Sequence, residues 1–213
     1  MLKDLVDAMA KRGMDLALAG AGLALTWPAM VLIAIAITWE DHQGAIFVQE
    51  RVGKDGKPFF LLKFRTMTPR GEEDSEVQVT VGEDPRVTRM GRLLRNVRLD
   101  ELPQLINILK GDMSVVGPRP EVPRYVDYYS EEQRLVLQVR PGLTDPATLA
   151  YRHEARRLAD SADPEATYIH EIMPEKLEMN LKYLSERNTF SDLRVFAKTV
   201  LAVLGDRIDV DKS

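Results

Sequence analysis

An Asp-Glu pair, Asp100-Glu101, stands near the middle of the chain, with arginines before it and a proline-rich turn after it. Adjacent carboxylates flanked by arginines suggest chemistry on a phosphorylated substrate, because arginine binds phosphate oxygens through paired hydrogen bonds. An ionised carboxylate near a cation can also act as a nucleophile. Neighbouring residues of a helix diverge by about 100°, so the two acids would have different roles. One could attack phosphorus while the other holds a hard divalent cation.

A structural interpretation accounts for the same pair. A helix from about Asp100 to Leu109 is predicted from four apolar residues at helical spacing: Leu102, Leu105, Ile106 and Leu109. Pro103 is tolerated only in a first turn, which places the helix start near Asp100. Asp100 would then be an ordinary N-cap and Glu101 a favourable first-turn acid. The pair alone leaves both interpretations open.

A basic hairpin precedes the pair. Two short apolar runs, Ile46 to Val48 and Phe59 to Phe64, flank an Asp-Gly turn, which predicts strand–turn–strand. In the second strand Lys63 and Arg65 share one face, where two cations could hold a diphosphate. A solvated edge strand, or a patch attracted to anionic lipid, explains the pattern equally well.

Further arginines lie on both sides of the pair. Five recur every three residues before it: Arg86, Arg89, Arg92, Arg95 and Arg98. In a helix, three residues rotate about 60° less than a full turn, so the five arginines spiral around the helix and do not share one face. Only neighbouring arginines can therefore converge on one ligand. Arg95 is the one expected to share a site with the acids. Gly117-Pro118-Arg119-Pro120 and Arg140-Pro141-Gly142 are rigid turns that present Arg119 and Arg140, either to a site or for structural reasons.

The run from Leu16 to Trp39 contains no charged residue, and a straight helix of that length spans about 36 Å, enough to cross a hydrocarbon core of about 30 Å. Pro28 predicts a kink or break near its middle. Basic residues, which mark the cytoplasmic side, flank both ends: Lys11, Arg12, Arg51, Lys54 and Lys57. A re-entrant helix–break–helix satisfies both flanks. A straight span or a buried soluble helix is the alternative.

Composition limits the class of protein. The formal net charge is −4, so nucleic acid is not an expected partner. The chain has no cysteine, which excludes disulfides and thiolate metal sites. His42, His153 and His170 lack the spacing of metal-binding residues. The polar, acidic segment Glu72 to Gln78 is predicted to be an exposed loop.

Two helices are predicted near the C-terminus. Pro174 to Arg187 is charged and amphipathic. Apolar residues then recur at helical spacing from Phe190 to Leu204, and Gly205 is expected to end that helix. This last helix either packs on the core or lies in a membrane interface, with Arg194 and Lys198 reaching the headgroups.

Five segments form a recognisable series: KRGMDL (Lys11–Leu16), FVQERVGKDGKPF (Phe47–Phe59), KFRTM (Lys63–Met67), LDELPQLINILKGDMSVVGPRPE (Leu99–Glu121) and RPGLT (Arg140–Thr144). Together they resemble the bacterial sugar transferase family, the monotopic phosphoglycosyl transferases that start glycan assembly on a polyprenol phosphate carrier. The resemblance implies a re-entrant membrane helix broken at Pro28. It also implies that Asp100 attacks a UDP-sugar, releases UMP and forms a phosphosugar–aspartate intermediate. Polyprenol (undecaprenyl) phosphate then takes the sugar phosphate, giving polyprenyl-diphospho-sugar.

The resemblance also assigns residues. Glu101, with Asp100, would hold Mg²⁺, and Lys63 and Arg95 match active-site cations. Arg119 and Arg140 match the family's phosphate- or nucleotide-side loops. We expect substrate binding by these two arginines and also by Arg65 and Glu121. Two departures are Trp27, where many relatives carry serine before the proline, and the segment Asp145–Leu158, which lacks the common continuation after RPGLT and leaves the sugar unassigned.

The sequence therefore predicts a mixed α/β, predominantly helical fold with a short β-hairpin or sheet. Residues 1–43 form a re-entrant membrane helix with its flanks, and residues 44–213 form a cytosolic catalytic domain with amphipathic helices. The expected location is the cytoplasmic face of a bacterial inner membrane, among membrane lipids, without a long multi-span extension. A non-catalytic membrane adaptor or a nucleotide-binding regulator with the same fold is the alternative.

Overall fold

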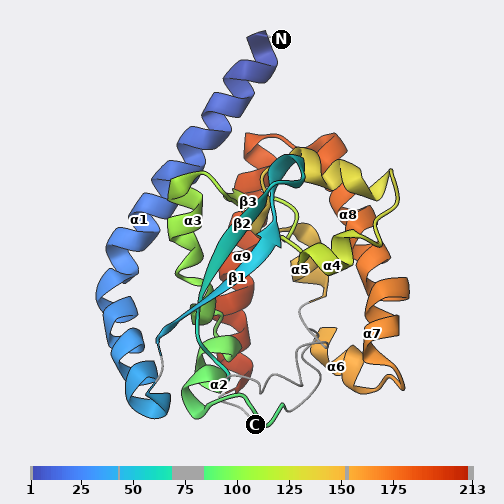
Figure 1. Cartoon of the computed structure of the whole chain (residues 1–213). Helices are drawn as coiled ribbons and strands as arrows, with labels where there is room; N and C mark the ends of the chain where they lie inside the picture. Colours follow the sequence, from blue (N-terminus) through green and yellow to red (C-terminus); the bar gives the residue numbers. More distant parts are fainter. Residues whose placement is uncertain (1, 43, 69–83, 152–153, 211–213) are drawn as a thin grey trace.

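The computed structural model describes residues 2–42, 44–68, 84–151 and 154–210 (Figure 1). The helices and helical turns are α1 (Leu2–Asp41), η1 (Lys54–Gly56), α2 (Arg89–Asn96), η3 (Leu99–Glu101), α3 (Gln104–Lys110), α4 (Pro123–Val126), η4 (Gln133–Gln138), α5 (Pro146–Ala150), α6 (Glu154–Ala159), α7 (Pro164–Thr167), η5 (Tyr168–Ile172), α8 (Met173–Glu186) and α9 (Thr189–Val210). The strands are β1 (Ile46–Val52), β2 (Pro58–Phe64), β3 (Ser114–Val116) and β4 (Gly142–Thr144). The predominantly helical class with a small sheet is confirmed. The predicted loop at Glu72–Gln78 lies outside the described residues.

The predicted hairpin is confirmed. β1 and β2 pair antiparallel, with Ile46 opposite Phe64 and Val52 opposite Pro58. At the turn Asp55 has φ 58° and the following glycine φ 74°, the left-handed conformation that Asp-Gly hairpin turns adopt. Asn107 of α3 then bonds to β2 in both directions, accepting from Leu62 N at 3.0 Å and donating to a carbonyl of β2 at 2.8 Å. This side chain fixes α3 against the strand.

A second, parallel pairing of β3 with β4 was not predicted from the sequence. Ser114 lies opposite Gly142 and Val116 opposite Thr144. β3 is buried and β4 is buried except at its middle residue. Each strand has three residues and lies next to one of the two predicted rigid turns. Their pairing brings the turn after β3 beside the turn before β4.

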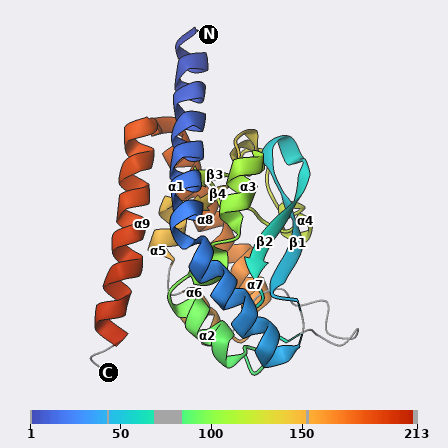
Figure 2. The ribbon, with the colours of Figure 1, turned by 90° about the vertical axis from the view of Figure 1, so that its left-hand side faces the viewer.

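Helix α1 is assigned without interruption through Pro28, and Figure 2 shows its axis changing direction along its length. Proline has no N–H, so the carbonyl four residues earlier loses its helical donor. Thr26 also bonds back to the Gly22 carbonyl at 2.8 Å, a contact that tends to bend helices. By length and composition α1 could cross a membrane, from Val6 to Glu40.

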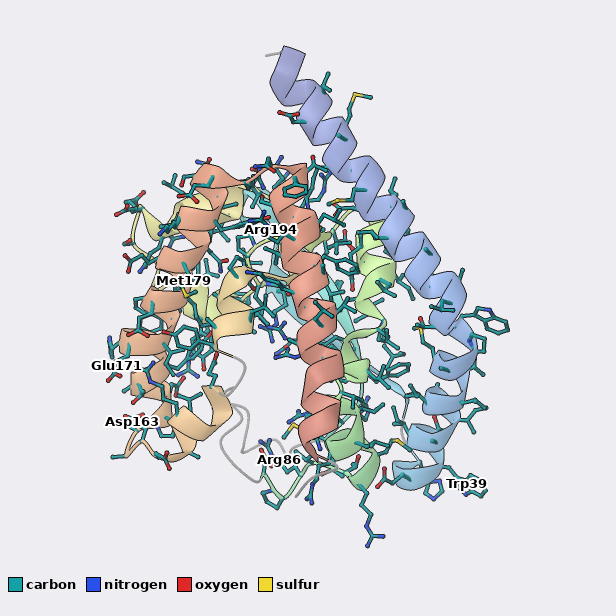
Figure 3. The ribbon with its side chains drawn as sticks, turned by 180° about the vertical axis from the view of Figure 1, so that it is seen from behind. Trp39, Arg86, Asp163, Glu171, Met179 and Arg194 are labelled. Carbon is teal, nitrogen blue, oxygen red and sulfur yellow. The ribbon has the colours of Figure 1, made fainter. Side chains whose placement is uncertain are left out.

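One face of α1 is apolar and exposed. Leu25 is 82% exposed, Leu32 68% and Trp39 80%, and Figure 3 shows Trp39 projecting away from the rest of the molecule. The opposite face packs on β2, α3 and β3 through Ala19, and on β2 and α2 through Ile37. The exposed face is therefore apolar surface without a partner in the described chain, which suits a membrane-associated helix.

Both ends of the apolar run of α1 are attached to the same body. Near its start Lys11 lies 2.7 Å from Asp192 of α9, and Asp15 accepts a 3.0 Å hydrogen bond from Val115 N of β3. Near its end the Glu40 carboxylate accepts from the first two N–H groups of α2, at 3.0 and 3.1 Å. The contacts with β3 and α2 tie the two ends of α1 to elements that lead into the acidic site.

The predicted helix start at Asp100 is wrong. Leu99 to Glu101 form a separate 3₁₀ turn, and α3 begins only at Gln104, with Pro103 at its N-cap position and no side-chain cap. Pro103 has no N–H group to donate. The backbone hydrogen bonds on either side of it join residues three positions apart, from Leu102 N to Leu99 O and from Ile106 N to Pro103 O, as in a 3₁₀ turn. Asp100 is therefore not the N-cap of α3, which removes the capping interpretation.

The predicted end of the last helix at Gly205 is also wrong. Helix α9 continues to Val210, and Gly205 is not among the positive-φ glycines of the described residues. Glycine costs a helix about 1 kcal/mol relative to alanine, which does not by itself terminate one. The helix predicted at Pro174–Arg187 corresponds to α8 and is confirmed within one residue at either end.

Candidate active site

Three segments that are distant in the sequence converge on Glu101. Arg119, in the turn after β3, places Nη2 2.5 Å from Glu101 Oε1. Lys63, at the end of β2, places Nζ 3.8 Å from the same oxygen. The Glu101 side chain is 10% exposed, so these charges interact in a largely water-excluded setting. The structure thus brings Glu101, Arg119 and Lys63 together.

The turn that carries Arg119 is held by the pairing of β3 with β4. Gly117 N donates to Thr144 O at 3.0 Å, and Gly142 N donates to Pro118 O at 2.9 Å. A Cβ at Gly117 would lie 2.6 Å from Arg140 O, closer than carbon and oxygen can approach. Glycine is therefore required where the two turns meet, and their close contact sets the direction of Arg119.

Arg95 approaches the pair from α2. Its Nε donates a 2.9 Å hydrogen bond to Thr66 Oγ1, just beyond β2. Helix α2 can come this close because Gly91 has no side chain: a Cβ there would lie 2.1 Å from Thr66 O. Thr88 caps the helix by accepting from Gly91 N at 2.9 Å. Arg95 is positioned by Thr66, a residue that the sequence did not single out.

The two acids experience opposite environments. Burial raises the pKa of Glu101, but the positive charges of Arg119 and Lys63 outweigh it and hold that pKa well below its usual range. For Asp100, burial and the negative charge of Glu101 raise the pKa, and the cations Lys63 and Arg95 offset this only in part. Glu101 is therefore held ionised, while the adjacent Asp100 is the more basic carboxylate. Two carboxylates whose pKa values are moved apart by their surroundings are suited to different chemical roles.

The cations are shifted as well. Burial, then the charge of Arg119, lowers the pKa of Lys63 to about 8, although Glu101 acts in the opposite direction. Burial also lowers the pKa of Arg95, against the charge of Asp100. Partly desolvated cations next to a carboxylate interact with an anion more strongly than they would in water. The arrangement can bind phosphate oxygens and stabilise charge that develops on them.

Two predicted substrate-binding residues, Arg65 and Arg140, make other contacts. Arg65 Nε donates to Gly44 O at 2.7 Å, and Arg140 Nε donates to Gly111 O at 2.8 Å. Both side chains retain further donors, so these contacts leave their predicted roles as predictions. Arg140 also contributes the backbone against which the turn of Arg119 packs.

Glu121 lies between two residues that sequence reasoning did not select. Arg51 Nη1 is 3.7 Å from Glu121 Oε2, and the Tyr168 hydroxyl donates to Glu121 Oε1. Arg51 also donates to Pro120 O at 3.1 Å, directly after Arg119. Arg51 could have been selected from the sequence because it belongs to the cluster of basic residues in the hairpin. No sequence pattern marks Tyr168. This set braces the far side of the turn, and substrate binding by Glu121 stays a prediction.

The acidic pair is compatible with Mg²⁺. In the described ranges no group of three His, Cys, Asp or Glu side chains could hold a metal ion. Mg²⁺ is commonly held by one or two carboxylates together with substrate phosphates and water, so a pair suffices. Arg119 and Lys63 both contact Oε1 of Glu101, which leaves Oε2 for another partner. Glu101, with Asp100, is the donor set that could hold the ion.

Comparison with known proteins gives a family match. The model of the family described as "Bacterial sugar transferase" matches residues 6–206. Two relatives are named as sugar-phosphate transferases. The UDP-glucose:undecaprenyl-phosphate glucose-1-phosphate transferase of Caulobacter vibrioides is 39% identical over 91% of this chain and 69% of its own length. The UDP-N-acetylgalactosamine-undecaprenyl-phosphate N-acetylgalactosaminephosphotransferase of Aeromonas hydrophila is 34% identical over 96% of this chain.

The relatives differ in length. This chain spans 46% of the Aeromonas hydrophila protein. It spans 87% of the exopolysaccharide production protein ExoY of Rhizobium meliloti, at 32% identity over 93% of this chain. The shared region includes most of α1, the hairpin, the acidic pair and both rigid turns, since the family match begins at residue 6 and ends at residue 206.

Proposed function

Because the chain belongs to the bacterial sugar transferase family, we propose that it transfers a sugar 1-phosphate from a UDP-sugar to polyprenol phosphate, releasing UMP and forming polyprenyl-diphospho-sugar. The observation that carries this proposal is the pair of adjacent carboxylates with opposite environments, Asp100 and Glu101, within one cluster of cations. The names of the relatives supply the classes of donor and acceptor.

In the first step Asp100 attacks the phosphorus that carries the sugar. Its raised pKa makes the carboxylate a better nucleophile, while Lys63 and Arg95 favour its ionised form. A bond forms between Asp100 and phosphorus, and the phosphoanhydride bond breaks, so the bonding electrons leave with UMP. The cations stabilise the negative charge that spreads over the phosphoryl oxygens.

In the second step a phosphate oxygen of the polyprenol phosphate attacks the same phosphorus. The bond from phosphorus to Asp100 breaks, the carboxylate is restored, and a new diphosphate forms. Arg119 lies opposite Glu101 and can contact the phosphate oxygens from the turn after β3. Mg²⁺, held by Glu101 with Asp100, would neutralise charge on the diphosphate.

We propose the same re-entrant topology for α1 that the basic flanks predict. Lys11 and Glu40, at the two ends of the apolar run, both attach to the body that carries the site. A helix that crossed the bilayer in a straight line would place one of these attachments on the opposite side. Entry and return on one side, with the bend near Pro28, keeps both on the cytoplasmic face of a bacterial inner membrane.

The direct experiment supplies purified protein with Mg²⁺, undecaprenyl phosphate and a panel of UDP-sugars, and measures UMP. We expect release with at least one donor and loss of release when the ion is chelated. No release across a broad panel would contradict the proposal and favour a non-catalytic membrane adaptor.

A further inference from the structure

A partly open cavity lies directly beside the acidic pair. A cavity of about 270 Å³ separates the η3–α3 segment from α9. Its wall is largely apolar, formed on one side by Leu102 and Leu105 and on the other by Phe196, Val200 and Val203 of α9. The α9 residues recur at three- and four-residue spacing, so one face of that helix lines the cavity.

The hydroxyl groups in the wall are already bonded within the protein. Thr144 and Thr199, both in the lining, share a 2.7 Å hydrogen bond between their hydroxyls. Thr148 donates to Asp145 Oδ2 at 2.6 Å. These bonded hydroxyl groups offer little to a polar occupant, so this part of the wall favours an apolar one.

The same cavity has a charged end. Arg98 and Glu101 both line it, and Glu101 is the residue that Arg119 and Lys63 contact. Asp100 stands between Arg98 and Glu101 in the chain, next to the lining. An occupant with an apolar chain and an anionic head would therefore place its head at the cation cluster, within one residue of the proposed nucleophile.

The cavity also borders apolar surface. Val200 lines it and is 41% exposed, and its neighbour Leu201 is 68% exposed. Figures 2 and 3 show α9 standing beside α1, and Phe196 belongs to the apolar cluster that joins these two helices. An apolar chain that lies along α9 at Val200 and Leu201 would therefore be next to the cavity.

We infer, resting on the proposed function, that this cavity holds the first isoprene units of the polyprenol phosphate acceptor, with the acceptor phosphate at Arg98. A cavity of about 150 Å³ accepts benzene, so the observed volume suits about two five-carbon units. Apolar walls, Arg98 at the end beside the nucleophile and an apolar border match an amphiphilic phosphate. They match neither a sugar nor a nucleotide.

The test fills the cavity and separates the two half-reactions. Ala202 lines the cavity and is half-buried, whereas Ala197 lies on the same helix, is exposed and is outside the lining. With a UDP-sugar that the wild type accepts, Ala202→Phe should raise the KM for undecaprenyl phosphate about tenfold or more. UMP release in a single turnover without acceptor should stay within twofold of wild type, and Ala197→Phe should change neither quantity.

Two results would overturn the assignment: an unchanged acceptor KM in Ala202→Phe, or loss of the acceptor-independent UMP burst in that variant. The second would assign the cavity to the donor. Absence of UMP release from the wild type with every UDP-sugar would instead remove the proposed function itself, and the acceptor assignment with it.

A second measurement uses the wild-type chain, so it does not depend on the folding of a variant. A prenyl phosphate with a diazirine on its second isoprene unit should label residues 196–203 or 143–149. Undecaprenyl phosphate should suppress that labelling, and phosphatidylcholine should not. Labelling confined to residues 16–39, or equal suppression by phosphatidylcholine, would contradict the inference.

Discussion

Arg119 donates a 2.5 Å hydrogen bond to Glu101, and this contact joins the turn after β3 to the turn before α3. The guanidinium holds Glu101 ionised although the carboxylate is buried, while the adjacent Asp100 has a raised pKa. One arginine thereby separates the properties of two neighbouring carboxylates.

Replacement of Arg119 by methionine should lower kcat/KM by about 10²-fold, because the site loses a donor that binds anions. Lys63, 3.8 Å from Glu101 Oε1, would then be the remaining cation that contacts Glu101. Tm should also fall, since a buried carboxylate loses its closest partner. Steady-state UMP release and thermal unfolding measure the two effects. Arg134→Met, at an exposed arginine in η4, is the control and should leave both unchanged. A similar loss in that variant would show that the effect is not specific to the site.

The pH dependence of the reaction should report Lys63. Burial, then the charge of Arg119, lowers its pKa to about 8, so the free protein loses this cation as pH rises through that value. If the cation is required, kcat/KM should fall on the basic side near pH 8. Lys63→Arg should shift the fall to higher pH, because arginine stays protonated.

If the Lys63→Arg variant is active and its kcat/KM falls at the same basic pH as that of the wild type, Lys63 is not the titrating group. Lys57→Arg, at an exposed lysine of the same hairpin, is the matched control and should leave the profile unchanged.

Thr66 should act as a positioning residue through Arg95. Thr66→Val removes the hydroxyl that accepts from Arg95 Nε, and loss of one such hydrogen bond corresponds to about a 2- to 10-fold decrease in kcat/KM. Thr66→Ser keeps the hydroxyl and should restore the rate. Equal defects in the two variants, measured at equal Tm, would show that the hydroxyl is not what matters.

The topology of α1 can be measured by cysteine labelling, because the chain has no cysteine of its own. Met9→Cys and Lys54→Cys, on either side of the apolar run, should both react with a membrane-impermeant reagent only from the cytoplasmic side. Leu25→Cys, within the exposed apolar face, should react from neither side. Labelling of the first two from opposite sides would establish a spanning helix.

Local features of the fold could be predicted from the sequence. The Asp-Gly turn and its flanking apolar runs predicted the β1–β2 hairpin, and the apolar period of the last third predicted α8 and most of α9. The predicted ends of helices were wrong where the prediction rested on a single residue. Gly205 was expected to stop α9, yet it keeps a negative φ and the helix continues.

Candidate site residues could be selected from the sequence, but the way they pair in space could not. Spacing and the family resemblance selected Lys63, Arg95, Asp100, Glu101 and Arg119. That Arg119 pairs with Glu101, and not with Asp100, depends on the parallel pairing of β3 with β4, a long-range contact without a local pattern. The bond from Thr66 to Arg95 likewise depends on the missing side chain of Gly91, whose effect appears only when α2 is packed.

The central claim is that Asp100 is the nucleophile, and the most direct measurement is mass analysis of the protein after exposure to a donor. The wild type, incubated with Mg²⁺ and an accepted UDP-sugar without acceptor, should carry a sugar-phosphate adduct on the peptide containing Asp100. Undecaprenyl phosphate should remove it. Asp100→Asn should fold and show neither adduct nor turnover. An adduct on another residue, or substantial turnover by Asp100→Asn, would contradict the account.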